Sequence, residues 1–190
     1  MTWNDCGVWD QTGKKRNRGR TACSIARYAV DDFVLLKLEL IAVGTRPPGW
    51  ILQGIEQYAS RMKRQCHFEI SEVRTSDRKK PKSVAGHQTE EARAISTRVS
   101  KNARVIAMDS SGKNWSTEEF AGKLEDWSQH TNHFQFIIGG PDGLAKECLQ
   151  RADNIWSLSN LTFPHFLVRV LLAEQIYRAL MVNTHHPYHK

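Results

Sequence analysis

The chain has 190 residues, 40% of them hydrophobic and six of them tryptophan, which is enough apolar material for one folded domain and excludes a disordered protein. Its 27 basic residues outnumber its 20 acidic ones and give a formal charge of +7, which favours anionic partners such as nucleic acid. The four cysteines have no CxxC spacing, which argues against a disulfide framework or a zinc ribbon and fits a reducing compartment. No apolar run reaches the roughly 18 residues of a membrane span, so we expect a cytoplasmic protein without a membrane partner.

Residues 1–35 show no sustained hydrophobic period and contain the basic run Lys14–Arg20. They lack the apolar stretch of a secretory signal, and their aspartates count against an organelle transit peptide. A basic RNA-binding arm is an open alternative. Because scattered apolar residues cannot offset the entropy of ordering the segment, we expect a disordered extension outside the folded domain.

Strand and helix patterns alternate after this extension, which predicts an α/β fold with an open, mostly parallel sheet and helices on both faces. Short apolar or alternating runs predict strands at residues 37–43, 67–73, 104–109, 134–138 and 155–158. Helices are expected after Pro47 and Pro48, around Ala92 to Val99, after a capping box at Ser116 and Glu119, and from His165 to Val182. A loop is expected from Ser110 to Trp115.

The basic segment Arg74–Lys82 carries five positive charges and one negative charge. A solvated loop and a phosphate-contacting arm are equally compatible with it, because lysine and arginine on a flexible loop can follow a nucleic-acid backbone.

Two loops that follow predicted strands are candidates for ligand binding. Gly139-Gly140-Pro141-Asp142-Gly143 has three glycines in five residues, which suits a sharp turn or a close approach to a ligand. The second loop runs from Ser159 to Pro164. Ligands of α/β proteins bind where such loops meet, at the carboxyl ends of the strands. The glycine loop alone lacks a phosphate-binding pattern, so two tight turns remain the plainer alternative.

The C-terminal helix is apolar on more than one side, so either the core of one chain or a homodimer interface must cover it. Within it, Arg169 suits either an anion contact or a helix-face salt bridge to Glu174. The tail contains His185, His186 and His189. Pro187 opposes the helix that would bring these histidines together, so we expect no metal site.

Four motifs stand in a fixed order: Gly139–Gly143, Ser157–His165, the helix beginning Leu167-Val168-Arg169-Val170, and the terminal His186-Pro187-Tyr188-His189. Together with the strand at residues 37–45 they resemble the ribosomal large-subunit pseudouridine methyltransferase family H (RlmH), of the SPOUT superfamily. The resemblance covers residues 36–190, one SPOUT methyltransferase domain, and residues 1–35 have no counterpart. A leucine codon can act as a start, so Leu36 is the expected initiator. The family implies a C-terminal trefoil knot, an exception to the rule that chains do not thread loops, and an obligate homodimer.

The resemblance also implies S-adenosyl-L-methionine as cofactor, held largely by the backbone of small-residue loops. The residues implied as its binding site are Met108, Gly139, Gly140, Ser159, Asn160, Leu161, Thr162, Phe163 and Pro164.

By the same resemblance, the enzyme methylates N3 of a pseudouridine in 23S rRNA, with the large subunit or the assembled ribosome as partner. The implied substrate contacts are Tyr188, His189 and Lys190. His189 could accept the N3 proton, and Lys190 or Arg169 could stabilise the resulting anion. A non-catalytic, ribosome-associated RNA-binding factor of the same fold is the alternative, and a transfer-RNA methyltransferase is a weaker one. The presence of both the glycine loop and the tail favours an enzyme.

Overall fold

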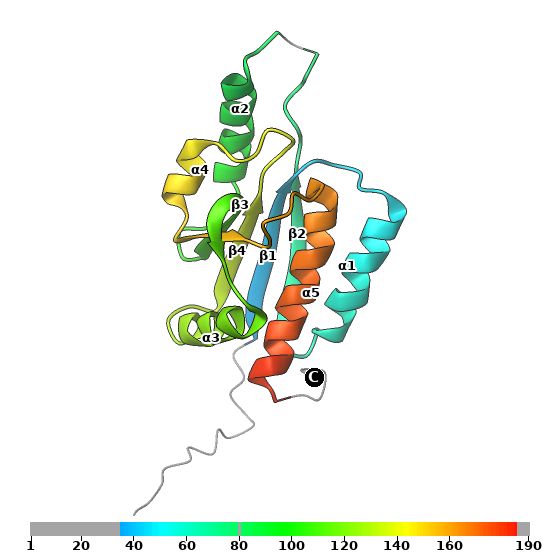
Figure 1. Cartoon of the computed structure of the whole chain (residues 1–190), viewed down its shortest axis with the longest axis vertical. Coiled ribbons are helices and arrows are strands. Elements are labelled where there is room, and N and C mark those ends of the chain that lie inside the picture. The colour runs from blue at the N-terminus through cyan, green and yellow to red at the C-terminus, as the bar shows by residue number, and fades with distance from the viewer. Residues whose placement is uncertain (1–34, 80, 186–190) are drawn as a thin grey trace, which may run out of the picture. The chain divides into compact units, whose positions relative to one another are not determined.

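The computed structural model describes residues 35–79 and 81–185 (Figure 1). Five strands are present there: β1 (Leu36–Val43), β2 (Cys66–Val73), β3 (Arg104–Asn114), β4 (His133–Ile138) and β5 (Asn154–Ser157). The helices of the same residues are α1 (Gly49–Arg61), α2 (Val84–Ser96), α3 (Thr117–Ser128), α4 (Lys146–Arg151) and α5 (His165–Asn183). None of these helices combines the length and the apolar character needed to cross a membrane.

The strands form one parallel sheet in the order β2-β1-β4-β3-β5. β2 is an edge strand, and the connection from β2 to β3 crosses β1 and β4. The connection from β4 to β5 crosses β3, which leaves β5 at the opposite edge of the sheet. This arrangement confirms the predicted open parallel α/β sheet. The trefoil knot stays a prediction.

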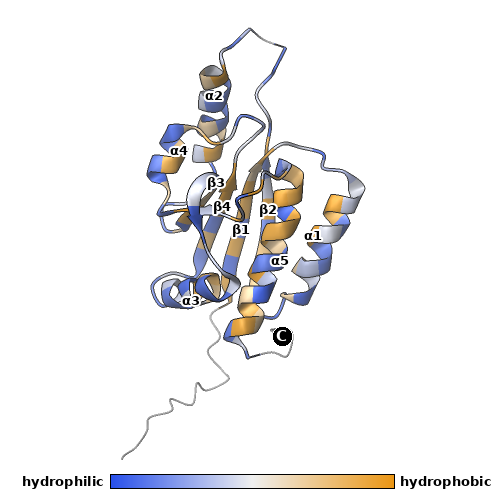
Figure 2. Ribbon diagram, viewed as in Figure 1, coloured by the Kyte–Doolittle hydropathy of each residue, from blue (hydrophilic) through white to orange (hydrophobic). Residues whose placement is uncertain are grey.

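Alternation along the strands divides the core into two layers, because successive side chains of a strand point to opposite faces. In β1, Leu38 and Leu40 pack in the layer that α1, α3 and α5 cover, whereas Ile41 and Val43 pack under α2 and α4. All four side chains are fully buried. Both faces are therefore apolar, and helices cover both of them as predicted. The hydropathy colours show hydrophobic residues along the strands and along α5 (Figure 2).

Aromatic residues fill the first layer. Trp156 of β5 is 2% exposed and stacks on Phe120 of α3 with ring centroids 4.4 Å apart, and Trp115 stacks on Trp156 at 5.2 Å. The predicted capping box at the start of α3 is present: the Ser116 hydroxyl accepts from the Glu119 amide at 3.1 Å, and the Glu119 carboxylate accepts from the Ser116 amide at 2.8 Å. The cap and the aromatic packing together fix α3 beside the end of β5.

Two local predictions were wrong. The expected loop at Ser110–Trp115 is mostly strand, because β3 continues to Asn114 and, after a register shift, pairs Lys113 with Trp156 and Asn114 with Ser157. Gly112 permits this pairing, since a Cβ there would lie 2.6 Å from the Ile155 carbonyl carbon. The second helix starts earlier than expected, at Val84, and ends at Ser96, so Val99 lies beyond it.

Two predictions concern residues outside the described part of the chain. Apart from Leu35, the expected N-terminal extension lies there, and so do the tail residues 186–190. Within the described residues, the first strand begins at Leu36, the position at which the domain was expected to begin.

Candidate cofactor site

The register of the sheet brings Met108 and the two predicted loops to one edge, where the carboxyl ends of the strands lie. Met108 pairs with Ile138 of β4 on one side and with Trp156 of β5 on the other. The glycine loop begins directly after Ile138, and the second loop begins shortly after Trp156. Because parallel strands present their carboxyl ends at the same edge, Met108, Gly139 and the Ser159–Pro164 loop share the type of location where α/β proteins bind ligands.

The glycine loop is a tight turn closed on itself. The Gly143 amide donates to the Gly140 carbonyl at 3.0 Å, with Pro141 and Asp142 at the two central positions. Gly143 has φ of +79°, in the region that favours glycine. A Cβ on Gly139 would lie 2.5 Å from the Gly143 carbonyl carbon, so only glycine fits there. The sharp turn that the three glycines suggested is therefore present.

Gly140 is packed from behind by the protein itself. A Cβ at this position would lie 2.7 Å from Oε2 of Glu91 and 3.0 Å from Cγ1 of Val43. The space that a side chain would enter is thus already filled by α2 and β1. Any ligand must approach Gly140 from its other side, through backbone atoms, which suits the backbone-lined pocket expected for S-adenosylmethionine.

Glu91 is a buried carboxylate, 3% exposed, at the centre of a polar network. Its Oε1 accepts from the Ser76 amide and from the Arg78 guanidinium, both at 3.0 Å. Arg78 also donates to the Asp142 carboxylate in the glycine loop, and this hydrogen bond raises the pKa of Arg78. The basic segment Arg74–Lys82 is therefore not simply solvated, because Arg78 pairs with acids of the domain, as Lys82 does with Glu90.

The second loop is held by its own polar side chains and is largely open to solvent. The Ser157 hydroxyl donates to the Ser159 carbonyl at 2.9 Å, and the Leu161 amide donates to the Ser159 hydroxyl at 3.0 Å. Asn114, in the extended end of β3, donates to Asn160 at 2.5 Å. Leu161 is 71% exposed. Thr162 and Pro164 are exposed and Phe163 is partly buried. The loop is thus tied to β3 while its tip remains accessible.

Arg169 has a different role from the two that the sequence suggested. It is fully buried and pairs with Glu72 of β2 at 3.0 Å, not with Glu174, which pairs with Arg178 at 2.6 Å. Its Nη2 also donates to the Gly44 carbonyl at 2.7 Å, where the backbone has φ of +111°. Burial lowers the pKa of Arg169. The side chain joins the start of α5 to the ends of β1 and β2, which makes it a structural residue of the same sheet edge.

His165, at the start of α5, is a further ionisable group at this edge. A Cβ on Gly44 would lie 3.2 Å from its Nε2, and its ring packs on Phe166 with centroids 4.1 Å apart. Burial and, next, the positive charge of Arg169 lower the pKa of His165. The imidazole is therefore neutral near pH 7 and able to accept a proton or a hydrogen bond.

The C-terminal tail lies mostly outside the described residues, so the predicted contacts of Tyr188, His189 and Lys190 have no structural description. Its first residue, His185, follows the C-terminal end of α5 and has a left-handed conformation with φ of +52°. Among residues 35–79 and 81–185, no cluster of three or more histidine, cysteine, aspartate or glutamate side chains is arranged to hold a metal.

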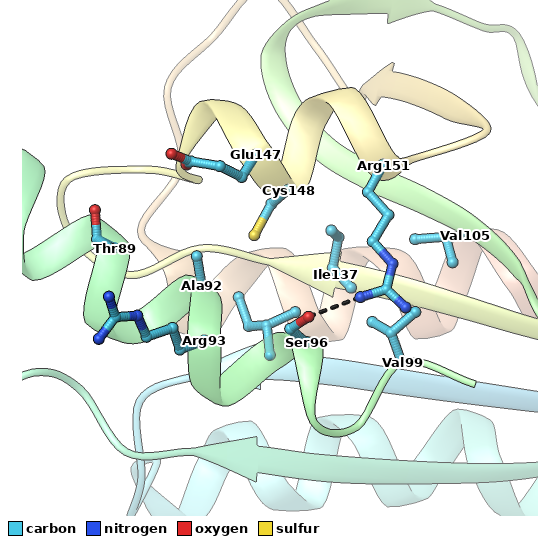
Figure 3. A pocket seen from close by; sticks show the side chains of 11 residues that line it. Thr89, Ala92, Arg93, Ser96, Val99, Val105, Ile137, Glu147, Cys148 and Arg151 are labelled. Atoms are coloured by element: carbon cyan, nitrogen blue, oxygen red, sulfur yellow. Dashed lines mark hydrogen bonds between the residues drawn. The ribbon is translucent and has the colours of Figure 1, made fainter. Parts of the chain in front are cut away.

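A separate cavity of about 250 Å³ lies between α2 and α4, on the face of the sheet that these two helices cover (Figure 3). Its lining is mainly apolar, with Ile137 and Cys148 at its base and a hydrogen bond of 2.7 Å from Arg151 to Ser96 at its side. Burial raises the pKa of the Cys148 thiol, which keeps it protonated. None of the predicted cofactor residues lines this cavity, so the loops at the sheet edge are the better candidate site.

Comparison with known proteins agrees with this fold and with the motifs. A family profile described as a predicted SPOUT methyltransferase matches residues 36–189. A protein from Nitrosococcus oceani named ribosomal RNA large subunit methyltransferase H is 46% identical over 159 residues, which are 82% of this chain and 99% of that protein. A protein of the same name from Pseudomonas fluorescens is 43% identical over 155 residues, 82% of this chain and all of that protein.

Among solved structures, a probable methylase family protein from Haemophilus influenzae aligns with a TM-score of 0.48 and 14% identity over 78% of this chain and 68% of that one. The chain belongs to the SPOUT methyltransferases and, within them, to the ribosomal RNA large subunit methyltransferase H family. S-adenosylmethionine is the methyl donor of this class, as the resemblance implied.

Proposed function

We propose that the protein transfers a methyl group from S-adenosylmethionine to large-subunit ribosomal RNA, at N3 of a pseudouridine. The observation that carries the proposal is the likeness to ribosomal RNA large subunit methyltransferase H at 46% identity over 99% of that relative's length. The convergence of Met108, the glycine loop and the Ser159–Pro164 loop at one sheet edge supports it.

The proposed cofactor residues are those that the motifs predicted. Gly139 and Gly140 are buried and would offer backbone groups, and Ser159 to Pro164 form a largely exposed loop at the same sheet edge. Met108, 8% exposed, lies in β3 between the two strands that precede these loops. S-adenosylmethionine would supply an electrophilic methyl group at this edge. The chain's own contribution there is to hold the two loops at a fixed separation.

The proposed substrate is consistent with the charge of the chain and the chemistry of the target. A uracil-like N3 must lose its proton before it accepts a methyl group, so a proton acceptor and a nearby positive charge would both assist. We assign these roles to the tail, with His189 as acceptor and Tyr188 and Lys190 as nucleotide contacts. The formal charge of +7 favours binding to ribosomal RNA.

We also propose that the enzyme acts as a homodimer through the outer side of α5 and the neighbouring α1. Leu167, Leu171 and Val182 of α5 are only partly buried in the single chain. On α1, Trp50 is 60% exposed and Leu52 is 52% exposed. Exposed apolar residues gathered on two adjacent helices are typical of an interface.

A non-catalytic RNA-binding factor is not favoured. The relatives that match the chain over 82% of its length are named ribosomal RNA large subunit methyltransferase H, which favours an enzyme.

The test is methyl transfer with purified components. The protein is incubated with S-adenosylmethionine and, in parallel, with large subunits and with assembled ribosomes that lack the modification, and nucleosides are then analysed by mass spectrometry. We expect a methylated pseudouridine in one or both reactions, and none when the chain is truncated after Pro187. Methylation of a different nucleoside would refute the N3-pseudouridine assignment, and no transfer to either particle would refute the proposed function.

A further inference from the structure

Arg78 joins two carboxylates that belong to different parts of the fold. It lies in the basic segment Arg74–Lys82, and its guanidinium donates through Nη1 to Asp142, in the turn after β4, and through Nη2 to Glu91, in α2. These acids are 64 and 13 positions away in sequence. A planar guanidinium can satisfy two carboxylates at once, which a lysine ammonium does less well.

The carboxylate that Arg78 holds is the one that supports Gly140 from behind. One oxygen of Glu91 is fixed by Arg78 and by the Ser76 amide. The other, Oε2, is buried, has no hydrogen-bond partner among the described residues, and lies 2.7 Å from where a Cβ on Gly140 would be. The position of Glu91 therefore determines how far back the Gly140 backbone can move.

Arg78 also holds the tip of the same turn. Asp142 forms an ion pair with Arg78 through its carboxylate, and its backbone carbonyl accepts a hydrogen bond from Gln88 of α2 at 2.7 Å. The turn itself is closed by the hydrogen bond from Gly143 to Gly140. Arg78 thus binds Asp142 at the tip of the turn and, at the same time, Glu91 behind Gly140.

We propose that Arg78 is a positioning residue for methyl transfer: it clamps the turn Gly140–Gly143 against Glu91 and thereby sets the affinity of the glycine loop for S-adenosylmethionine. The inference rests on the proposed function, because it takes this loop as part of the cofactor site. It gives one cation of the basic segment a task other than a phosphate contact.

The experiment compares Arg78→Gln with Arg74→Gln, a matched control that removes one positive charge from the same segment. Isothermal titration of the purified full-length protein measures the Kd for S-adenosylmethionine, and titration with a large-subunit rRNA fragment measures the Kd for RNA. Arg78→Gln should raise the Kd for S-adenosylmethionine about tenfold, the scale expected for loss of a charge-assisted contact, and Arg74→Gln should leave it unchanged. Arg78→Lys should recover only part of the affinity.

Two further measurements separate positioning from misfolding. Asp142→Asn breaks the same contact from the exposed turn, and its effect should not add to that of Arg78→Gln, because both variants lose one interaction. Exchange of the Gly143 amide with deuterium should be faster in Arg78→Gln than in Arg74→Gln, without any ligand present.

The affinity measurements separate failure of the positioning role from failure of the proposed function. Unchanged affinity for S-adenosylmethionine in Arg78→Gln, or weaker RNA binding as the sole effect, would overturn the positioning role while the proposed function stands. A parent protein without measurable affinity for S-adenosylmethionine would overturn the proposed function and this inference with it.

Discussion

Gly140→Ala tests whether the glycine loop is held from behind, as the packing indicates. The added Cβ would lie 2.7 Å from Oε2 of Glu91, a separation that must open to at least 3.0 Å. Glu91 cannot retreat freely, since Ser76 and Arg78 fix its other oxygen at 3.0 Å. Loss of one hydrogen bond to a charged group, or overpacking of this site, costs about 1–3 kcal/mol, so we expect the free energy of unfolding to fall by that amount.

Gly122→Ala is the matched control. Gly122 lies in the middle of α3, and a Cβ there meets nothing within 4 Å, so alanine should stabilise the helix by about 0.5–1 kcal/mol. Chemical denaturation of both variants gives the two free energies, and titration with S-adenosylmethionine gives the Kd. We expect Gly140→Ala to weaken binding about tenfold or more, because a small displacement of a binding loop is costly, and Gly122→Ala to leave it unchanged. A Gly140→Ala protein as stable as Gly122→Ala would refute the packing argument.

Three further predictions concern Arg169, His165 and the C-terminal tail. Arg169→Leu should lower the free energy of unfolding by about 2–4 kcal/mol, because it leaves Glu72 and two backbone carbonyls without their buried donor. Urea denaturation measures this loss, and Arg178→Leu, which removes a partly exposed arginine of the same helix, is the control. The folded state lowers the pKa of His165 and so resists its protonation; the stability that His165 contributes is present above its unfolded pKa of about 6.5 and is lost as the pH falls through the lower folded pKa. The difference in free energy of unfolding between the parent and His165→Asn should therefore shrink from about pH 7 to about pH 5. A constant difference over this range would contradict the lowered pKa. Truncation after Pro187 should leave the melting temperature unchanged within about a degree or two while methyl transfer collapses, and retained activity would remove Tyr188, His189 and Lys190 from the site.

The sheet and most helices could be predicted because their residues carry the periodicity of a two-layered core. In β1, Leu38 and Leu40 face one layer and Ile41 the other, and this alternation is visible in the sequence. The end of β3 could not be predicted, since Ser110, Ser111 and Gly112 read as a loop and their strand conformation depends on backbone pairing with β5. The six residues of α4 are too few for a helical period to emerge, and no side-chain cap marks the start of that helix.

The loops of the candidate site could be located from the sequence, but the residues that pack behind them could not. Glycine-rich composition indicates a tight turn wherever it occurs, so Gly139 and Gly140 were identifiable. The partner of Arg169 is Glu72, 97 positions away, and no spacing rule connects them, whereas Glu174 stood at a plausible helical distance. Glu91 and Arg78 were missed for the same reason. In the sequence, Glu91 is one acid on a helix and Arg78 is one of several cations in a basic segment, and only the fold brings both of them to the glycine loop.

Mass spectrometry of large-subunit ribosomal RNA from cells that lack the gene tests most directly whether this protein methylates a pseudouridine there. The proposed function predicts that one methylated pseudouridine disappears, and that the full-length protein restores it whereas a chain truncated after Pro187 does not. An unchanged set of methylated pseudouridines in the deletion strain would contradict it.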